Sequence, residues 1–86
     1  MKYMRDELIK FMERFYNVSE TDGDTNLYDL GYVNSLFGQQ LILFLEKKFN
    51  ISVEIEDMDI NNFSTINNIL AFVKKKQLEW WRKSEK

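Results

Sequence analysis

The chain has 86 residues, a formal net charge of −2, 44% hydrophobic residues and 15% aromatic residues. It contains no Cys and no His, which excludes thiol nucleophiles, Ser–His and Cys–His pairs, thiolate zinc sites and disulfide bonds. The small negative charge gives no general attraction to nucleic acid. With no Pro and only three Gly, long helices run uninterrupted. These features predict one small helical domain that acts as a binding or carrier module and not as an enzyme.

The first ten residues carry five charges, which excludes the apolar core of a signal peptide. No apolar run approaches the roughly 18 residues that a membrane span requires. We therefore expect a cytoplasmic protein.

Apolar residues at helical spacing predict an amphipathic first helix of about four turns. They are Met1, Met4, Leu8, Phe11, Met12 and Phe15. Turn-forming residues then predict a long loop over residues 17–34. Leu27, Leu30 and Val33 are expected to anchor this loop on the bundle, and a loop of this length is typical of a functional segment.

The second predicted helix runs from Ser35 to about Phe49, with Asn34 as its N-cap. A helical wheel places its residues on three faces. The inward face holds Gly38, Leu41, Ile42, Leu45 and Phe49, one flank holds Phe37 and Phe44, and the outward face holds Leu36, Gln40, Leu43 and Lys47. Two leucines are thus predicted to face solvent.

The remaining chain predicts a connector, a short helix and a long last helix. Ile51, Val53 and Ile55 are expected in an extended connector, because no other strand is available to pair with them. Residues 56–62 are expected to form a helical turn or two, and Ser64 or Thr65 caps the last helix. Its core stripe comprises Ile66, Ile69, Leu70 and Val73, and continues through Gln77 to Trp80 and Trp81.

The predicted architecture is therefore all-α: a four-helix bundle with three main helices, one short helix and a long loop between the first two. We expect one domain over residues 1–86, with the bundle in 1–76 and a C-terminal helical extension in 77–86.

Two segments suggest binding sites that further residues do not support. Residues 22–26 resemble the start of a calcium loop, but Leu27 and Val33 occupy the positions where an EF-hand needs Gly and Glu. The last thirteen residues have a formal charge of +4 and include Trp80 and Trp81, as in helices that bind membranes or nucleic acid. Positive charge also complements a helix C-terminus, and the Trp pair extends the core stripe. We therefore expect no metal site and no binding to nucleic acid or membranes, although the C-terminal tail can still contact a protein partner.

The most informative segment is Leu30-Gly31-Tyr32-Val33-Asn34-Ser35-Leu36. Gly31 permits a tight turn, and Ser35 lies in the first turn of a helix. Free backbone N–H groups and the positive end of the helix dipole would stabilise a phosphodiester on the Ser35 hydroxyl. On this reasoning alone, the alternative remains that Ser35 only begins the helix and carries no modification.

This pattern resembles the acyl carrier proteins, in which a Leu-Gly turn leads into Asp-Ser-Leu at the head of the second helix. The matching residues here are Leu30-Gly31 and Asn34-Ser35-Leu36, and the similarity extends over about residues 4–76. It implies that Ser35 carries covalent 4'-phosphopantetheine from coenzyme A, with Gly31, Asn34 and Leu36 supporting the motif. A phosphopantetheinyl transferase would supply the base and the magnesium that this chain lacks.

Two departures from the family pattern refine this expectation. Asn34 replaces the usual Asp, and the outward face of the second helix lacks the acidic residues typical of fatty-acid carriers. The sequence is most similar to stand-alone carriers of malonyl-type extender units in polyketide and nonribosomal-peptide synthesis. The expected partner, besides the transferase, is an acyl-loading enzyme, an acyltransferase, or a ketosynthase or condensation domain. It would dock on Leu36, Phe37, Gln40, Leu43 and Lys47 of a monomeric protein.

Other interpretations remain open at this point. The chain could be a peptidyl, D-alanyl or fatty-acid carrier, or an unmodified helical domain that binds proteins through Leu36, Leu43, Trp80 and Trp81.

Overall fold

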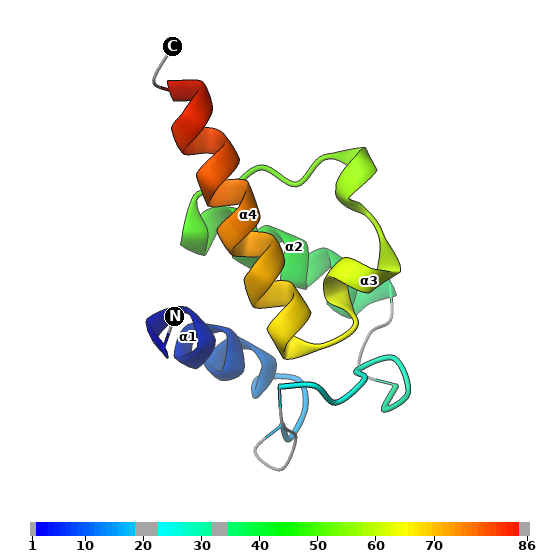
Figure 1. Cartoon of the computed structure of the whole chain (residues 1–86). Coiled ribbons are helices and arrows are strands. Elements are labelled where there is room, and N and C mark those ends of the chain that lie inside the picture. Colours follow the sequence, from blue (N-terminus) through cyan, green and yellow to red (C-terminus); the bar gives the residue numbers. More distant parts are fainter. Residues whose placement is uncertain (1, 19–22, 32–34, 85–86) are drawn as a thin grey trace.

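The computed structural model describes residues 2–18, 23–31 and 35–84. Its elements in chain order are α1 (Lys2–Met12), α2 (Ser35–Phe49), the short 3-10 helix η1 (Ile55–Asp57), α3 (Ile60–Phe63) and α4 (Ile66–Ser84) (Figure 1). The described residues include no strand, so the predicted all-α, four-helix architecture is confirmed.

The core lies where the apolar faces of α1, α2 and α4 meet. Its fully buried side chains come from all three helices and from the long loop, and include Leu8, Met12, Leu27, Leu41, Leu45, Ile66, Ile69 and Val73. These are the helical stripes that the sequence predicts. No buried side-chain polar atom of the described residues lacks a hydrogen-bond partner.

Phe37 belongs to this core, and its predicted place on a docking surface is wrong. Its side chain is only 2% exposed. Its ring packs edge-on against Phe15 at 5.4 Å and Tyr16 at 5.3 Å between centroids, while Phe11 stacks on Phe44 at 4.4 Å. These aromatic contacts turn α2 so that the flank carrying Phe37 faces α1.

Helix α1 is shorter than predicted. It ends at Met12, and the next residues form tighter turns in which the N–H groups of Arg14 and Phe15 donate to the carbonyls of Phe11 and Met12. This change of winding leaves Phe15 outside the helix and exposed, although its ring still contacts Phe11. Met1 lies outside the described residues.

The long loop is fastened to the start of α4 by backbone and side-chain hydrogen bonds. Leu27 is fully buried, and its N–H donates to the carbonyl of Ser64 at 2.7 Å. The Asn67 N–H donates to the Gly23 carbonyl, and the Asn67 side-chain amide donates to Asp24 at 2.9 Å. Leu27 is thus the anchor that was expected. Leu30 is exposed and is not an anchor, and Val33 lies outside the described residues.

Helix α2 ends at Phe49, and the next residue, Asn50, adopts a left-handed conformation with φ of +55°. Such a residue stops a helix because the next N–H groups turn away from its axis. The chain continues as an extended connector, in which Ile51 is buried and Val53 is half-buried. Ile55, also expected in the connector, is instead the exposed first residue of η1. Two short helices, η1 and α3, then lead to α4, as the sequence indicates.

Helix α4 runs 19 residues and extends beyond the bundle (Figure 1). It begins with Thr65 as cap, whose Oγ1 accepts from the Asn68 N–H at 3.0 Å. The predicted burial of Trp80 and Trp81 is wrong, because their side chains are 55% and 59% exposed. The Gln77 side chain donates to the carbonyl of Phe49, the last residue of α2, so α2 ends before the level of the tryptophans. Among the described residues, no helix is long and apolar enough to cross a membrane.

Candidate functional site

The candidate attachment residue, Ser35, is the first residue of α2. The preceding turn is held by Gly31, whose φ of +74° is unfavourable for other residues and whose N–H donates to the Tyr28 carbonyl at 3.0 Å. The expected tight turn at Gly31 is therefore present. Asn34, the expected N-cap, lies outside the described residues.

The start of α2 suits a phosphodiester. The first N–H groups of a 15-residue α-helix have no acceptor within the helix, and the helix dipole places partial positive charge beside them. A phosphate group on Ser35 would meet these donors, as anions do at other helix N-termini. The polar environment thus fits 4'-phosphopantetheine, which would supply the thiol that the chain lacks.

The outward surface of α2 carries two leucines, two glutamines and one lysine, and no acidic residue. We name it the outer α2 face and define it as Leu36, Gln39, Gln40, Leu43 and Lys47, all of which are exposed. Leu36 is 66% exposed and Leu43 is 59% exposed, as the helical wheel predicts. Phe37 is absent from this face because it lies in the core.

The single carboxylate of α2, Glu46, does not belong to the outer α2 face. It is half-buried, and its Oε2 accepts from the Val53 N–H of the connector at 2.9 Å. The Glu46 carboxylate is therefore engaged in a hydrogen bond that holds the connector against α2. This role of Glu46 cannot be predicted from helical periodicity, which gives no information on the path of the following segment.

A small apolar cavity of about 220 Å³ lies beside the first two turns of α2. Gly38 lines it, and a Cβ at this position would meet no atom within 4 Å beyond its chain neighbours and the nearby backbone of α2. Burial, followed by the charge of Asp59, raises the pKa of Tyr28, which lines the cavity. The other lining residues are Gln39, Leu41, Ile42, Met58 and Phe63. The sequence did not reveal this cavity, because three segments distant in sequence form it.

Two ion-paired clusters lie away from Ser35. The Glu7 carboxylate accepts from Lys48 at 2.6 Å, and this hydrogen bond lowers the pKa of Glu7 and raises that of Lys48. The Lys76 ammonium contacts Asp57 at 2.8 Å and Glu79 at 3.7 Å. Burial alone would raise the pKa of Asp57, but the hydrogen bonds from Lys76 and the Glu54 N–H, with the nearby lysine charges, bring it below its usual value. Both clusters join segments far apart in sequence.

Within the described ranges, no three or more Asp, Glu, Cys or His side chains are grouped so that they could hold a metal ion.

Comparison with known proteins agrees with this site. A family described as phosphopantetheine attachment site matches residues 6–73, which include the Gly31 turn, Ser35 and the first part of α4. Among curated proteins, none matches the chain. Members of this family are carrier domains that bear covalent 4'-phosphopantetheine, receive it from a phosphopantetheinyl transferase and work with acyl-processing enzymes. Because the match covers more than half of its length, the chain belongs to the phosphopantetheine attachment site family.

Proposed function

We propose that Ser35 is the attachment residue and that the protein is a discrete carrier of short acyl or aminoacyl thioesters, without catalytic activity of its own. The observation that supports this most is the position of Ser35 at the first residue of α2, four residues after the positive-φ Gly31. In the modification, the Ser35 oxygen forms a bond to the phosphorus of coenzyme A, and 3',5'-adenosine bisphosphate leaves. The transferase accepts the serine proton, because the chain has no His to do so.

Intact-mass spectrometry tests this assignment directly. After incubation with coenzyme A, magnesium and a broad-specificity transferase, the parent should gain one phosphopantetheine. Ser35→Ala should gain none, and Ser52→Ala, an exposed serine of the connector, should be modified like the parent. Modification of Ser35→Ala, or an unmodified parent, would overturn the proposal and favour an unmodified interaction domain.

We further propose that partner enzymes dock on the outer α2 face through apolar contacts. Leu36 and Leu43 are exposed there, and Glu46, the single acidic residue of α2, is bound to the connector. Fatty-acid carriers instead present acidic residues on this helix. The difference supports a carrier for malonyl-type extender units in polyketide or hybrid nonribosomal-peptide synthesis over a fatty-acid carrier.

The apolar cavity beside α2 supports a small cargo. Its volume of about 220 Å³ is below the roughly 300–1,000 Å³ of ordinary small-molecule pockets. It is suited to a few carbon atoms, and a long acyl chain would exceed it.

Leu43→Glu tests the docking surface. Burying Leu43 against a partner is worth about 1–2 kcal/mol, so the variant should lower kcat/KM for modification by the transferase about tenfold. Its thermal unfolding should match that of the parent, because Leu43 is exposed. Tyr3→Glu, a change of similar size at an exposed position of α1, should leave kcat/KM unaltered. An unaltered kcat/KM for Leu43→Glu would contradict this docking surface.

A further inference from the structure

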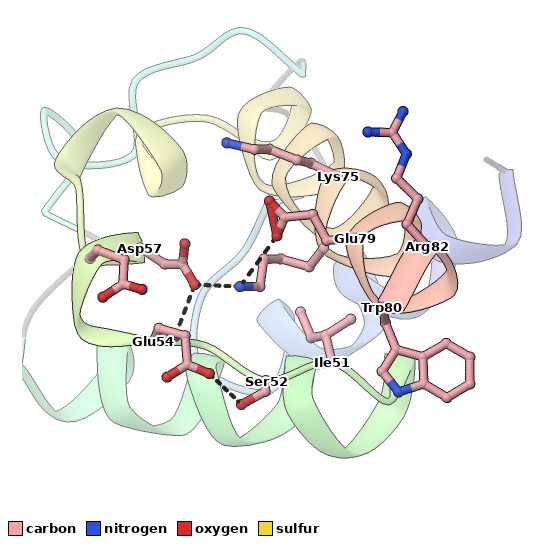
Figure 2. Close-up of a pocket in the computed structure, with 10 residues that line it drawn as sticks. Ile51, Ser52, Glu54, Asp57, Lys75, Glu79, Trp80 and Arg82 are labelled. Atoms are coloured by element: carbon pink, nitrogen blue, oxygen red, sulfur yellow. Dashed lines mark hydrogen bonds and ion pairs between the residues drawn. The ribbon is translucent and has the colours of Figure 1, made fainter. Parts of the chain in front are cut away.

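A groove lies beside the C-terminal turns of α4, facing the connector and η1 that follow α2 (Figure 2). We name it the end groove; its volume is about 670 Å³. The connector and η1 contribute Ile51, Glu54 and Glu56 to its lining and together form what we name the connector wall, and α4 contributes Lys75, Trp80 and Arg82. Lys76 of α4 is ion-paired with Asp57 of η1 and with Glu79 of α4. The Lys76–Asp57 pair joins the two walls, whereas the Lys76–Glu79 pair lies within α4.

In the end groove, the core face of α4 continues beyond the point where α2 covers it. Trp80 follows Val73 by two helical turns and so lies on the same face of the helix. Val73 is fully buried, whereas Trp80 is 55% exposed, because α2 ends where Gln77 contacts the Phe49 carbonyl. A large aromatic side chain beside a groove is typical of the centre of a protein interface.

The charges of the end groove are divided between its walls. Glu54 and Glu56 make the connector wall acidic, and Lys75 and Arg82 make the α4 wall basic; all four are exposed. No ion pair within 4.0 Å joins Lys75 or Arg82 to another described residue. A surface with one acidic and one basic half is complementary to a copy of itself rotated by a two-fold axis. An anionic lipid surface would instead meet repulsion from Glu54 and Glu56.

We propose that the end groove is a two-fold dimer interface between two copies of this chain. Trp80 of each copy lies in the end groove of the other, with Lys75 and Arg82 opposite the partner's acidic wall. This inference goes beyond carrier function, since the part of the end groove nearest to α2 begins with Ile51, after the helix has ended, whereas Ser35 is its first residue. A dimer departs from the monomer expected from the sequence, where both tryptophans were assigned to the core.

Sedimentation velocity of the full 86-residue chain, from micromolar to millimolar concentration, measures this association. The average mass should rise from 10.4 kDa towards twice that value. Trp80→Ala should raise the dimer dissociation constant at least about tenfold, because interfacial Trp residues carry much of the binding energy. Trp81→Ala is the matched control: Trp81 is equally exposed but does not line the end groove, so its replacement should change the constant little.

Charge reversal gives a second, more specific test. Glu56→Lys and Arg82→Glu should each prevent association alone, because each places like charges on facing walls. Mixing the two variants should restore a dimer, since the reversed walls then attract each other. Lys74→Glu, at an exposed lysine of α4 outside the end groove, should behave like the parent.

Three results would overturn the proposal: a monomer at all concentrations, a dimer equally weakened by Trp80→Ala and Trp81→Ala, or no restored association on mixing. Trp80-dependent binding to vesicles containing anionic lipid, without dimer formation, would assign the end groove to a membrane surface instead. Ser35→Ala should dimerise like the parent, so failure of this inference is distinguishable from failure of the carrier assignment.

Discussion

Helix α2 and the connector that follows it are neighbours in sequence but are held in place by different forces. The helix is held by packing: Phe37, Leu41 and Leu45 are buried against α1 and α4. The connector buries Ile51, η1 at its end leaves Ile55 exposed, and both are held mainly by polar contacts through Glu46 and Asp57. The difference indicates that pH should affect the connector, and with it the end groove, much more than the packing of the helix that carries Ser35.

The largest expected effect comes from removing packing at α2. Phe37→Ala should lower the free energy of unfolding by about 3–5 kcal/mol, because it leaves a cavity within the aromatic cluster. Urea denaturation should show this loss to nearly the same extent at pH 5 and pH 8. Leu36→Ala, the adjacent exposed residue, should change stability by less than about 0.5 kcal/mol. If the two variants were equally stable, Phe37 would not be a core residue.

A smaller, pH-dependent effect should follow from Asp57→Asn. Losing a hydrogen bond between charged groups at this half-buried position should cost about 1–2 kcal/mol near neutral pH. The pKa of Asp57 is lowered in the folded state, so its contribution is complete above the unfolded value of about 3.9 and is lost as pH falls through the folded pKa. The pKa of Lys76 is raised, so the same contact is also lost at alkaline pH, as the pH rises through the folded pKa of Lys76.

Thermal unfolding measured across pH gives the difference in stability between the parent and Asp57→Asn. This difference should be largest at neutral pH and should disappear as the pH falls below about 4. Glu56→Gln removes a charge from the same segment, but Glu56 makes no hydrogen bond to Lys76. Its stability should therefore differ little from that of the parent at any pH. A pH-independent difference for Asp57→Asn would mean that the ion pair does not hold the connector.

The smallest effect should come from Glu46. Glu46→Ala removes the acceptor for the Val53 N–H and should cost about 0.5–1.5 kcal/mol. Glu46→Gln retains a side-chain carbonyl and should recover most of this loss, whereas Lys47→Ala on the outer α2 face should be neutral. Faster hydrogen exchange of the Val53 amide in Glu46→Ala alone would locate the effect in the connector. Unchanged exchange would contradict this role for Glu46.

Local patterns predicted what depends on helical periodicity. The bounds of α2, the exposure of Leu36 and Leu43, and the buried stripe of α4 from Ile66 to Val73 all follow from spacing of 3.6 residues. The turn at Gly31 follows from the backbone freedom of glycine. These features place the candidate attachment residue at the start of α2.

The errors have a common physical cause. Periodicity gives the face on which a residue lies, but not whether another helix is present at that height. Trp80 lies on the core face of α4, yet α2 has already ended there. Phe37 lies at the edge of the predicted inward face, and contacts with Phe15 and Tyr16, distant in sequence, decide its burial. The apolar cavity and the role of Glu46 depend on tertiary contacts in the same way.

The position of the tryptophans has a consequence for spectroscopy. Both Trp residues of the chain are exposed on the last turns of α4, and the core contains none. Intrinsic fluorescence should therefore report poorly on unfolding of the bundle, since the indoles are solvated before and after. The same emission should shift to shorter wavelength when a second molecule covers Trp80, so the native chain carries its own optical probe of self-association.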